Sequence, residues 1–97
     1  MNGGDRMNFI VIRNYLKENG FDFISYYDAI QGEYEIAVRT NKNNLKMFTF
    51  KDLHFSHSYI SICDYDKFTE SVVKNIITVG QFADVVVNRG GKSSPEK

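Results

Sequence analysis

Several features are absent from this sequence of 97 residues, which has no tryptophan, a single cysteine, a single proline and no long hydrophobic run. Because Cys63 has no second cysteine to pair with, an intrachain disulfide and a cysteine-based zinc site are both excluded. A lone cysteine also favours a reducing compartment. The first apolar stretch, Phe9 to Ile12, is far shorter than the ~20 residues that span a bilayer. We therefore expect a cytoplasmic protein with no membrane partner.

A net charge is also absent, because twelve basic residues balance twelve acidic ones. The charges are scattered along the chain, so no strong field attracts nucleic acid or anionic lipid. A hydrophobic content of 42% is enough for a core. The length fits one domain, which we place at residues 7–88. Residues 1–6 are expected to be a disordered leader outside the fold. Residues 89–97 are expected to be a disordered tail, because they lack any apolar anchor.

The composition points to an AT-rich gene, with nine Asn, nine Ile and eight Lys against three Ala and three Leu. Residues 2–6 can be back-translated into a sequence that contains a near-perfect bacterial ribosome-binding site just before Met7. Met7 is therefore an alternative start to Met1. The equally plausible alternative is that Gly3 and Gly4 belong to a flexible leader.

Helical spacing of Phe9, Ile12 and Leu16 predicts a helix over residues 8–19. Asn19 and Gly20 are typical of a C-terminal cap, with Phe21 placed to contact Leu16. A second helix is predicted to begin at Asp64 or Asp66, since aspartate is a favoured N-cap. Its apolar stripe contains Phe68, Val72 and Ile76, among other residues.

Between these helices the period changes to two, which predicts strands at residues 21–27, 34–40, 45–50 and 58–63. A β-hairpin over residues 33–50 is the firmest local prediction, because the asparagine-rich segment 41–44 suits a turn. Residues 82–88 fit either a helical turn or a strand. The fold class is thus α+β: a four-stranded, mainly antiparallel meander with an N-terminal and a C-terminal helix on one face. The buried core should contain Leu16, Ile36, Val38, Ile60, Phe68, Val72 and Ile76.

Chemical motifs are sparse. His54 and His57 do not have the helical spacing that aims two imidazoles at one metal ion, and nothing places a base beside Cys63. Asp52, Asp64 and Asp66 could hold Mg²⁺ only if they converged, and a capping role is preferred. No phosphate-binding loop or nucleophile motif occurs. We therefore expect no catalytic residue, no metal and no cofactor, and a protein that is not an enzyme.

Surplus aromatic residues favour an interface, where aromatics are enriched. We expect a small protein-binding module. In size and composition the chain resembles the small accessory proteins of phages and mobile elements, which implies inhibition of a host or defence protein, as in anti-CRISPR proteins. Two alternatives stay open. One is a nucleic-acid-binding domain that uses an aromatic and basic sheet face, and the other is a homo-oligomeric structural protein such as a homodimer.

Alternation along residues 33–39 turns Tyr34, Ile36 and Val38 toward the core, and the intervening residues toward an open sheet face. On that face Phe48 would be an exposed aromatic anchor with charged residues around it. The expected partner-binding residues are Tyr27, Glu33, Glu35, Arg39, Lys46 and Phe48.

Overall fold

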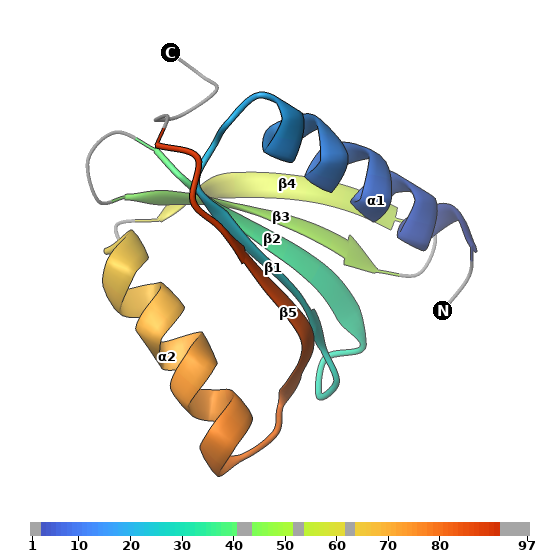
Figure 1. Ribbon diagram of the computed structural model, residues 1–97. Coiled ribbons are helices and arrows are strands. Elements are labelled where there is room, and N and C mark those ends of the chain that lie inside the picture. The colour runs from blue at the N-terminus through green and yellow to red at the C-terminus, as the bar shows by residue number, and fades with distance from the viewer. Residues whose placement is uncertain (1–2, 41–43, 52–53, 62–63, 92–97) are drawn as a thin grey trace.

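The computed structural model describes residues 3–40, 44–51, 54–61 and 64–91, and for residues 3–6, 51 and 54–61 it describes the backbone alone. The described residues form two helices and five strands, which follow one another along the chain (Figure 1). In chain order they are α1 (Gly3–Glu18), β1 (Phe23–Asp28), β2 (Glu33–Arg39), β3 (Leu45–Lys51), β4 (His54–Ser61), α2 (Tyr65–Thr78) and β5 (Phe82–Asn88). The α+β class is therefore confirmed.

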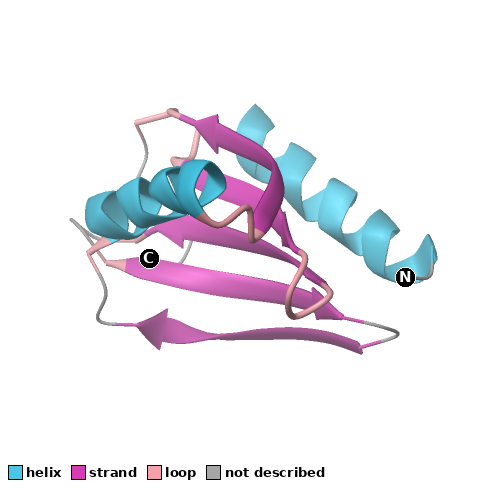
Figure 2. Cartoon of the chain, turned by 90° about the horizontal axis from the view of Figure 1, so that it is seen from below, coloured by secondary structure: helices cyan, strands magenta, loops and turns pink. Residues whose placement is uncertain are grey.

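All five strands form one sheet in the order β4-β3-β2-β1-β5, and every neighbouring pair is antiparallel (Figure 2). Strands β1 to β4 form the predicted meander. In the predicted hairpin, Tyr34 lies opposite Phe50 and Arg39 opposite Leu45. The sheet has one strand more than predicted, because residues 82–88 are a strand that returns to pair with β1. The three consecutive valines of β5 suit a strand, where β-branched side chains pack well.

Helix α1 ends as its sequence predicts. Gly20 has a φ of +76°, and the N–H of Phe21 donates to the carbonyl of Leu16 at 3.1 Å. This is the Schellman arrangement, in which glycine adopts the left-handed conformation without a steric penalty. The start of α1 differs from the prediction, because the helix begins at Gly3 and so includes most of the expected leader. Residues 1–2 lie outside the described part of the chain.

The two helices cover opposite faces of the sheet, which corrects the prediction that both lie on one face (Figure 1). The α1 face carries a cluster that includes Phe9, Phe23 and Ile36. The α2 face carries a second cluster, to which the neighbouring residues Ile24 and Ala37 belong. Strands β1 and β2 therefore bury both of their faces, as central strands covered on both sides do.

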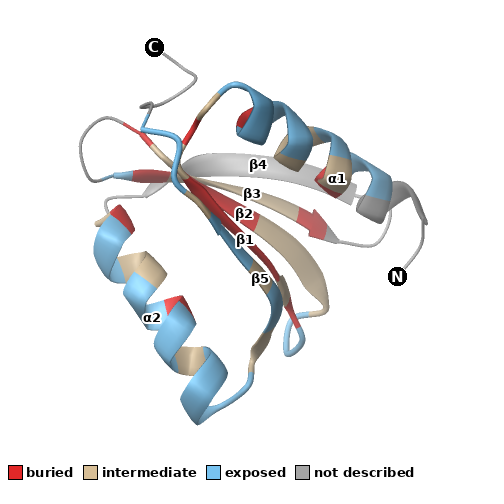
Figure 3. Cartoon of the chain, in the orientation of Figure 1, coloured by how far each residue is buried: buried red, intermediate tan, exposed pale blue. Residues whose placement is uncertain are grey.

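Helix α2 is mostly exposed. Asp64 caps its N-terminus as predicted and accepts hydrogen bonds from the N–H groups of Asp66 and Lys67. Only Tyr65 and Val72 of this helix are buried, and most of its surface is exposed (Figure 3). Of the predicted core, Leu16, Ile36, Val38 and Val72 are buried and Phe68 is partly buried. Ile76 is 40% exposed, so its prediction was wrong, and the side chain of Ile60 is not among those described.

The chain after β5 is tied back to the start of β1. The N–H groups of Gly90 and Gly91 both donate to Oδ1 of Asp22 at 2.6 Å. Gly90 also approaches Gly20 so closely that a Cβ atom on it would collide with the Gly20 carbonyl group, so only glycine can occupy this position. The predicted tail therefore begins with ordered residues, while residues 92–97 lie outside the described chain.

Candidate functional site

The six residues expected to form one binding face are divided between the two faces of the sheet. Tyr27 and Phe48 lie on the α1 side, where the Tyr27 ring is 4.9 Å from the Tyr34 ring and Phe48 packs against the α1-side core. Lys46 shares that face, with its Nζ 5.8 Å from the centre of the Phe48 ring. Phe48 is thus partly buried instead of being an exposed anchor. No single open face of the predicted composition exists among the described residues.

Glu33, Glu35 and Arg39 lie on the α2 side, in alternation with the α1-side residues of β2. The expected wet face is therefore partly covered by α2. Arg39 is the most constrained of the three: its Nε donates to Oδ2 of Asp22 at 2.9 Å, and its Nη2 donates to Oδ1 of Asp66 at 2.8 Å. Its guanidinium also lies over the Tyr65 ring, 4.7 Å from the ring centre.

Asp22 is the more buried of the two carboxylates that bind Arg39, with 16% of its side chain exposed against 59% for Asp66. Partial burial raises the pKa of Asp22, but hydrogen bonds from the Gly91 N–H, from Arg39 and from the Gly90 N–H outweigh that effect and leave the pKa below its ordinary value. The ionised Asp22 carboxylate therefore joins the residue before β1 to Arg39 at the end of β2 and to Gly90 and Gly91 after β5.

A cavity of about 310 Å³ opens beside this ion-pair network, and we name it the α2-side pocket. Its walls are formed by α2, by the end of β5 and by Arg39 with the carboxylate of Asp22. The lining residues are Asp22, Arg39, Tyr65, Asp66, Thr69, Glu70, Val87, Asn88 and Arg89. The hydroxyls of Tyr65 and Thr69 are buried and have no hydrogen-bond partner. Burial raises the pKa of Tyr65 to about 12, so its hydroxyl stays protonated at neutral pH.

A second cavity, of about 400 Å³, lies on the other face, and we name it the α1-side pocket. Its walls come from α1, β2 and β5, namely Phe9, Ile10, Arg13, Tyr34, Asp84, Val85 and Val86. Arg13 lies over the Phe9 ring, with its Cζ 5.2 Å from the ring centre. Nearby, Ser25 is fully buried between its strand partners Ile36 and Val86, and its Oγ has no hydrogen-bond partner.

Strand β5 separates the two pockets and lies at the edge of the sheet. The Arg39 N–H donates to the carbonyl of Asp22, whereas the Ala29 N–H donates to the carbonyl of Gln81. The backbone N–H and C=O groups of even-numbered residues in β1 therefore point toward β2, and those of odd-numbered residues point toward β5. Because Val87 lies opposite Ile24, its N–H and C=O point away from β1. They form an unpaired stretch of edge, as far as the described residues show.

A bulge limits the length of this free edge. The pairing of β1 with β5 shifts register between Ser25 and Tyr27, where Asp84 has a φ of +52°. Such bulges bend a strand and end regular pairing. The regular part of the edge therefore runs from Val85 to Asn88. The free edge of β5 was not among the predicted binding residues, because the sequence did not decide whether residues 82–88 form a strand or a helical turn. The run Val85–Val87 was the signal for a strand.

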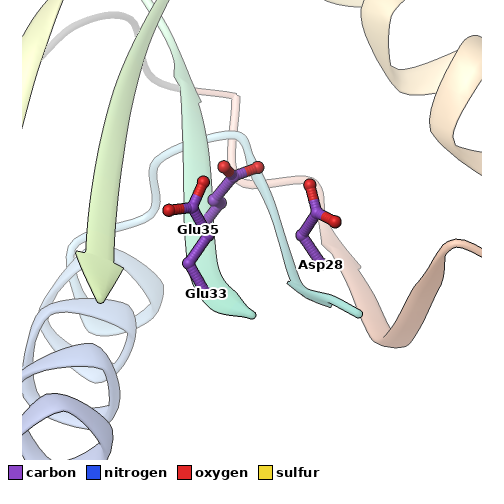
Figure 4. A group of neighbouring side chains, drawn as sticks. All are labelled: Asp28, Glu33 and Glu35. Carbon is purple, nitrogen blue, oxygen red and sulfur yellow. The ribbon is translucent and has the colours of Figure 1, made fainter. Parts of the chain in front are cut away.

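Three carboxylates lie close together near the turn that connects β1 to β2 (Figure 4). Asp28, Glu33 and Glu35 each place an oxygen within 4.8 Å of the other two. Such a group offers the oxygen ligands of a hard cation, but Asp28 already accepts hydrogen bonds from the N–H groups of Ile30 and Gln31, and both of its oxygens accept from the Gln81 side chain. Asp28 thus has a structural task, which is to close the hairpin turn.

Glu35 carries the proton of this cluster. Its burial raises its pKa first, and the neighbouring Glu33 raises it further, to about 8. The carboxyl group is therefore mainly protonated at neutral pH, which relieves the repulsion among the three acids. Nearby Tyr26 is buried, and its hydroxyl lies 3.9 Å from the Met47 sulfur. Burial also raises the Tyr26 pKa.

Comparisons with protein-family models, with curated proteins and with solved structures found no match to this chain. No helix among the described residues is long and apolar enough to cross a membrane.

Proposed function

We propose that this domain is a non-enzymatic protein-binding module that takes an extended segment of its partner along the free edge of β5. The observation that carries the proposal is the position of β5: it is the last strand of the sheet, and each of its two faces borders a pocket. Pockets on both sides of an edge strand provide places for the alternate side chains of an added strand.

The chemistry of the edge defines the occupant. The unpaired N–H and C=O of Val87 need an acceptor and a donor at the spacing of a β-ladder, which another extended backbone supplies. The side chains of Val86 and Val87 are 42% and 37% exposed, so they add apolar surface that a partner can cover. The bulge at Asp84 and the short regular edge would limit uncontrolled pairing with further chains.

The proposed partner is a host or defence protein that this domain inhibits by binding in the cytoplasm. The size and composition of the chain, which resemble those of phage and mobile-element accessory proteins, support this part of the proposal. The nucleic-acid alternative gains no support from the geometry, because Arg39 is bound by two carboxylates and because Lys46 and Arg39 lie on opposite faces. The homo-oligomer alternative is kept as an outcome of the experiments below.

The test is selection of ligands from a library of displayed random peptides against the full chain, followed by binding measurements on Val87→Pro. Because the Val87 N–H points away from β1, proline at this position should preserve the sheet while removing the donor that an added strand needs. The matched control is Val87→Ala, which shortens the side chain but keeps the N–H.

We expect the selected peptides to bind Val87→Ala nearly as well as the wild-type chain and to bind Val87→Pro at least about tenfold more weakly. Thermal unfolding should show that both variants are folded. Peptides that bind Val87→Pro with unchanged affinity would place the binding site elsewhere, and failure to enrich any peptide would also contradict the proposal.

A further inference from the structure

We infer that the partner's segment alternates apolar with basic residues, so that its apolar side chains enter the α1-side pocket and its basic side chains face the α2-side pocket. The inference rests on the proposed function, because it describes the segment that the edge of β5 would take. It is carried by the arrangement of the two pockets, by their different chemistry and by the composition of β5.

The two pockets border successive stretches of β5: Asp84, Val85 and Val86 line the α1-side pocket, and Val87 and Asn88 line the α2-side pocket. They meet at Val86 and Val87, whose side chains lie on opposite faces of the sheet. Their partners in β1, Ser25 and Ile24, likewise lie on opposite faces of the sheet. A strand that pairs with β5 presents its own side chains to these two faces in turn. Consecutive residues of a bound segment therefore face opposite sides of the sheet, and the two that lie beside Val86 and Val87 are directed toward different pockets.

The α1-side pocket suits an apolar side chain. Most of its wall is aromatic or aliphatic, with Phe9, Ile10, Tyr34 and Val86 among its residues. Its two charged residues, Arg13 and Asp84, have opposite signs, so they produce no net attraction for either charge. Ligand pockets of this kind gain most from apolar surface removed from water.

The α2-side pocket suits a basic side chain. Three carboxylates line it, against the two guanidinium groups of Arg39 and Arg89. Arg39 is shared between Asp22 and Asp66, and Glu70 is exposed and forms no ion pair with any described residue. The excess of negative charge at a partly enclosed surface attracts a cation.

A second copy of this chain fits the two pockets less well. Its β5 carries valine at three consecutive positions, 85–87, so it would present valine to the charged pocket as well as to the apolar one. Placing an apolar group against partly buried charges desolvates them without compensation. The occupant is therefore a segment of another protein.

The test compares two short, blocked peptides of equal length, one alternating valine with lysine and the other alternating valine with glutamate. Each is titrated into the isotope-labelled full chain at low salt, and amide chemical shifts report the site and the affinity. We expect the valine–lysine peptide to bind at least about tenfold more tightly, with shifts along β5 and around both pockets.

Charge reversal at the pocket sharpens the test. Glu70→Lys should reduce the preference for lysine at least about threefold. The matched control Glu18→Lys makes the same change of charge on an exposed position of α1, outside both pockets, and should retain the preference. An equal effect of the two variants would mean that overall charge, and not the α2-side pocket, selects the peptide, which would overturn the inference.

The remaining outcomes separate this inference from the proposed function. If both peptides bind at β5 with equal affinity, or if the glutamate peptide binds better, the charge preference is wrong while strand addition stands. If neither peptide shifts β5, the charge pattern is also wrong, and the library selection alone decides the proposed function. If the chain dimerises and Val87→Pro dissociates it, the occupant is a second copy and the inference is overturned.

Discussion

The two faces of the sheet are each covered by one helix, but they are packed differently. On the α1 face the buried cluster is entirely apolar, with aromatic rings such as Phe9 and Phe50 stacked edge to face at 5.9 Å. Each helix contributes two buried residues, Phe9 and Leu16 from the described part of α1 and Tyr65 and Val72 from α2. The α2 face differs in holding the Arg39 ion pairs, the acidic cluster and, among the described residues, two hydroxyls without partners, those of Tyr65 and Thr69, against that of Ser25 on the α1 face.

This difference separates stability from function. Apolar burial is the main favourable term in folding, so the α1 face should hold most of the stability. Buried polar groups without partners cost free energy, and in the described part of the chain two of them, the hydroxyls of Tyr65 and Thr69, lie on the α2 face against one, that of Ser25, on the α1 face. Exposed apolar residues contribute little to folding, and both helices carry them, as Val11 at 60% and Ile77 at 81% show. Because the charged groups and most of the described unpartnered hydroxyls lie on the α2 face, we expect this face and β5 to be the less stable side of the domain, which is where binding surfaces are expected.

The largest expected effect is loss of the α1-side core. Ile36 is fully buried, so Ile36→Ala should lower the free energy of unfolding by about 2–5 kcal/mol. The equivalent change on α2, Ile76→Ala, should alter it by only about 0.5 kcal/mol because that side chain is 40% exposed. Urea denaturation measures both. Equal effects of the two substitutions would remove the distinction between the faces.

The next effect compares the two carboxylates that bind Arg39. Asp22→Asn should cost about 1–3 kcal/mol, because it weakens a mostly buried ion pair and the hydrogen bonds from Gly90 and Gly91. Asp66→Asn should cost about 0.2–1 kcal/mol, since the Asp66 side chain is 59% exposed. A larger loss for Asp66→Asn than for Asp22→Asn would show that the order is wrong.

An effect confined to part of the pH range should appear in the pH dependence of stability. The pKa of Glu35 rises from 4.5 to about 8 on folding, so the folded state holds this proton more tightly than the unfolded state does. The contribution of the protonated Glu35 carboxyl group to stability is complete below pH 4.5 and is lost as the pH rises through about 8. Glu35→Gln, which keeps a neutral side chain at every pH, should therefore melt at a higher temperature than the wild-type chain above pH 8.

Below pH 4.5 the melting temperatures of the Glu35→Gln variant and the wild-type chain should converge. The control Glu70→Gln removes a carboxylate outside the acidic cluster and should not show this pattern. A Glu35→Gln variant whose melting temperature differs from that of wild type by the same amount at every pH would mean that Glu35 titrates normally.

Local patterns predicted the elements of this fold well. The Gly20 cap, the Asp64 cap and the hairpin over residues 33–50 are set by neighbouring residues, so the sequence carried enough information for each. Whether residues 82–88 form a strand or a helical turn could not be decided from the sequence, because the valines at 85–87 favour a strand while the spacing of Phe82 and Val86 fits a helix. Pairing with β1, a contact between distant parts of the chain, makes them a strand.

The placement of α2 could not be predicted from the alternation in β2 alone. Glu33 and Glu35 indicated an open face, yet Ile24, Tyr26 and Ala37 give the same side enough apolar surface to pack a helix. The signal was present in β1, where residues of both faces are apolar. The binding site depends on long-range contacts, since both pockets combine residues of a helix with residues of β5. For that reason only Arg39, among the six residues predicted to bind a partner, lines either pocket.

The most direct test of the central claim is native-state hydrogen exchange of the two helices. If the α1 face holds the stability and the α2 face is less stable, the best-protected amides of α1 should exchange only through global unfolding. Those in the C-terminal half of α2, near Ile76 and Ile77, should exchange through a local opening of lower free energy that depends little on denaturant. Equal protection of both helices, with the same denaturant dependence, would contradict the account.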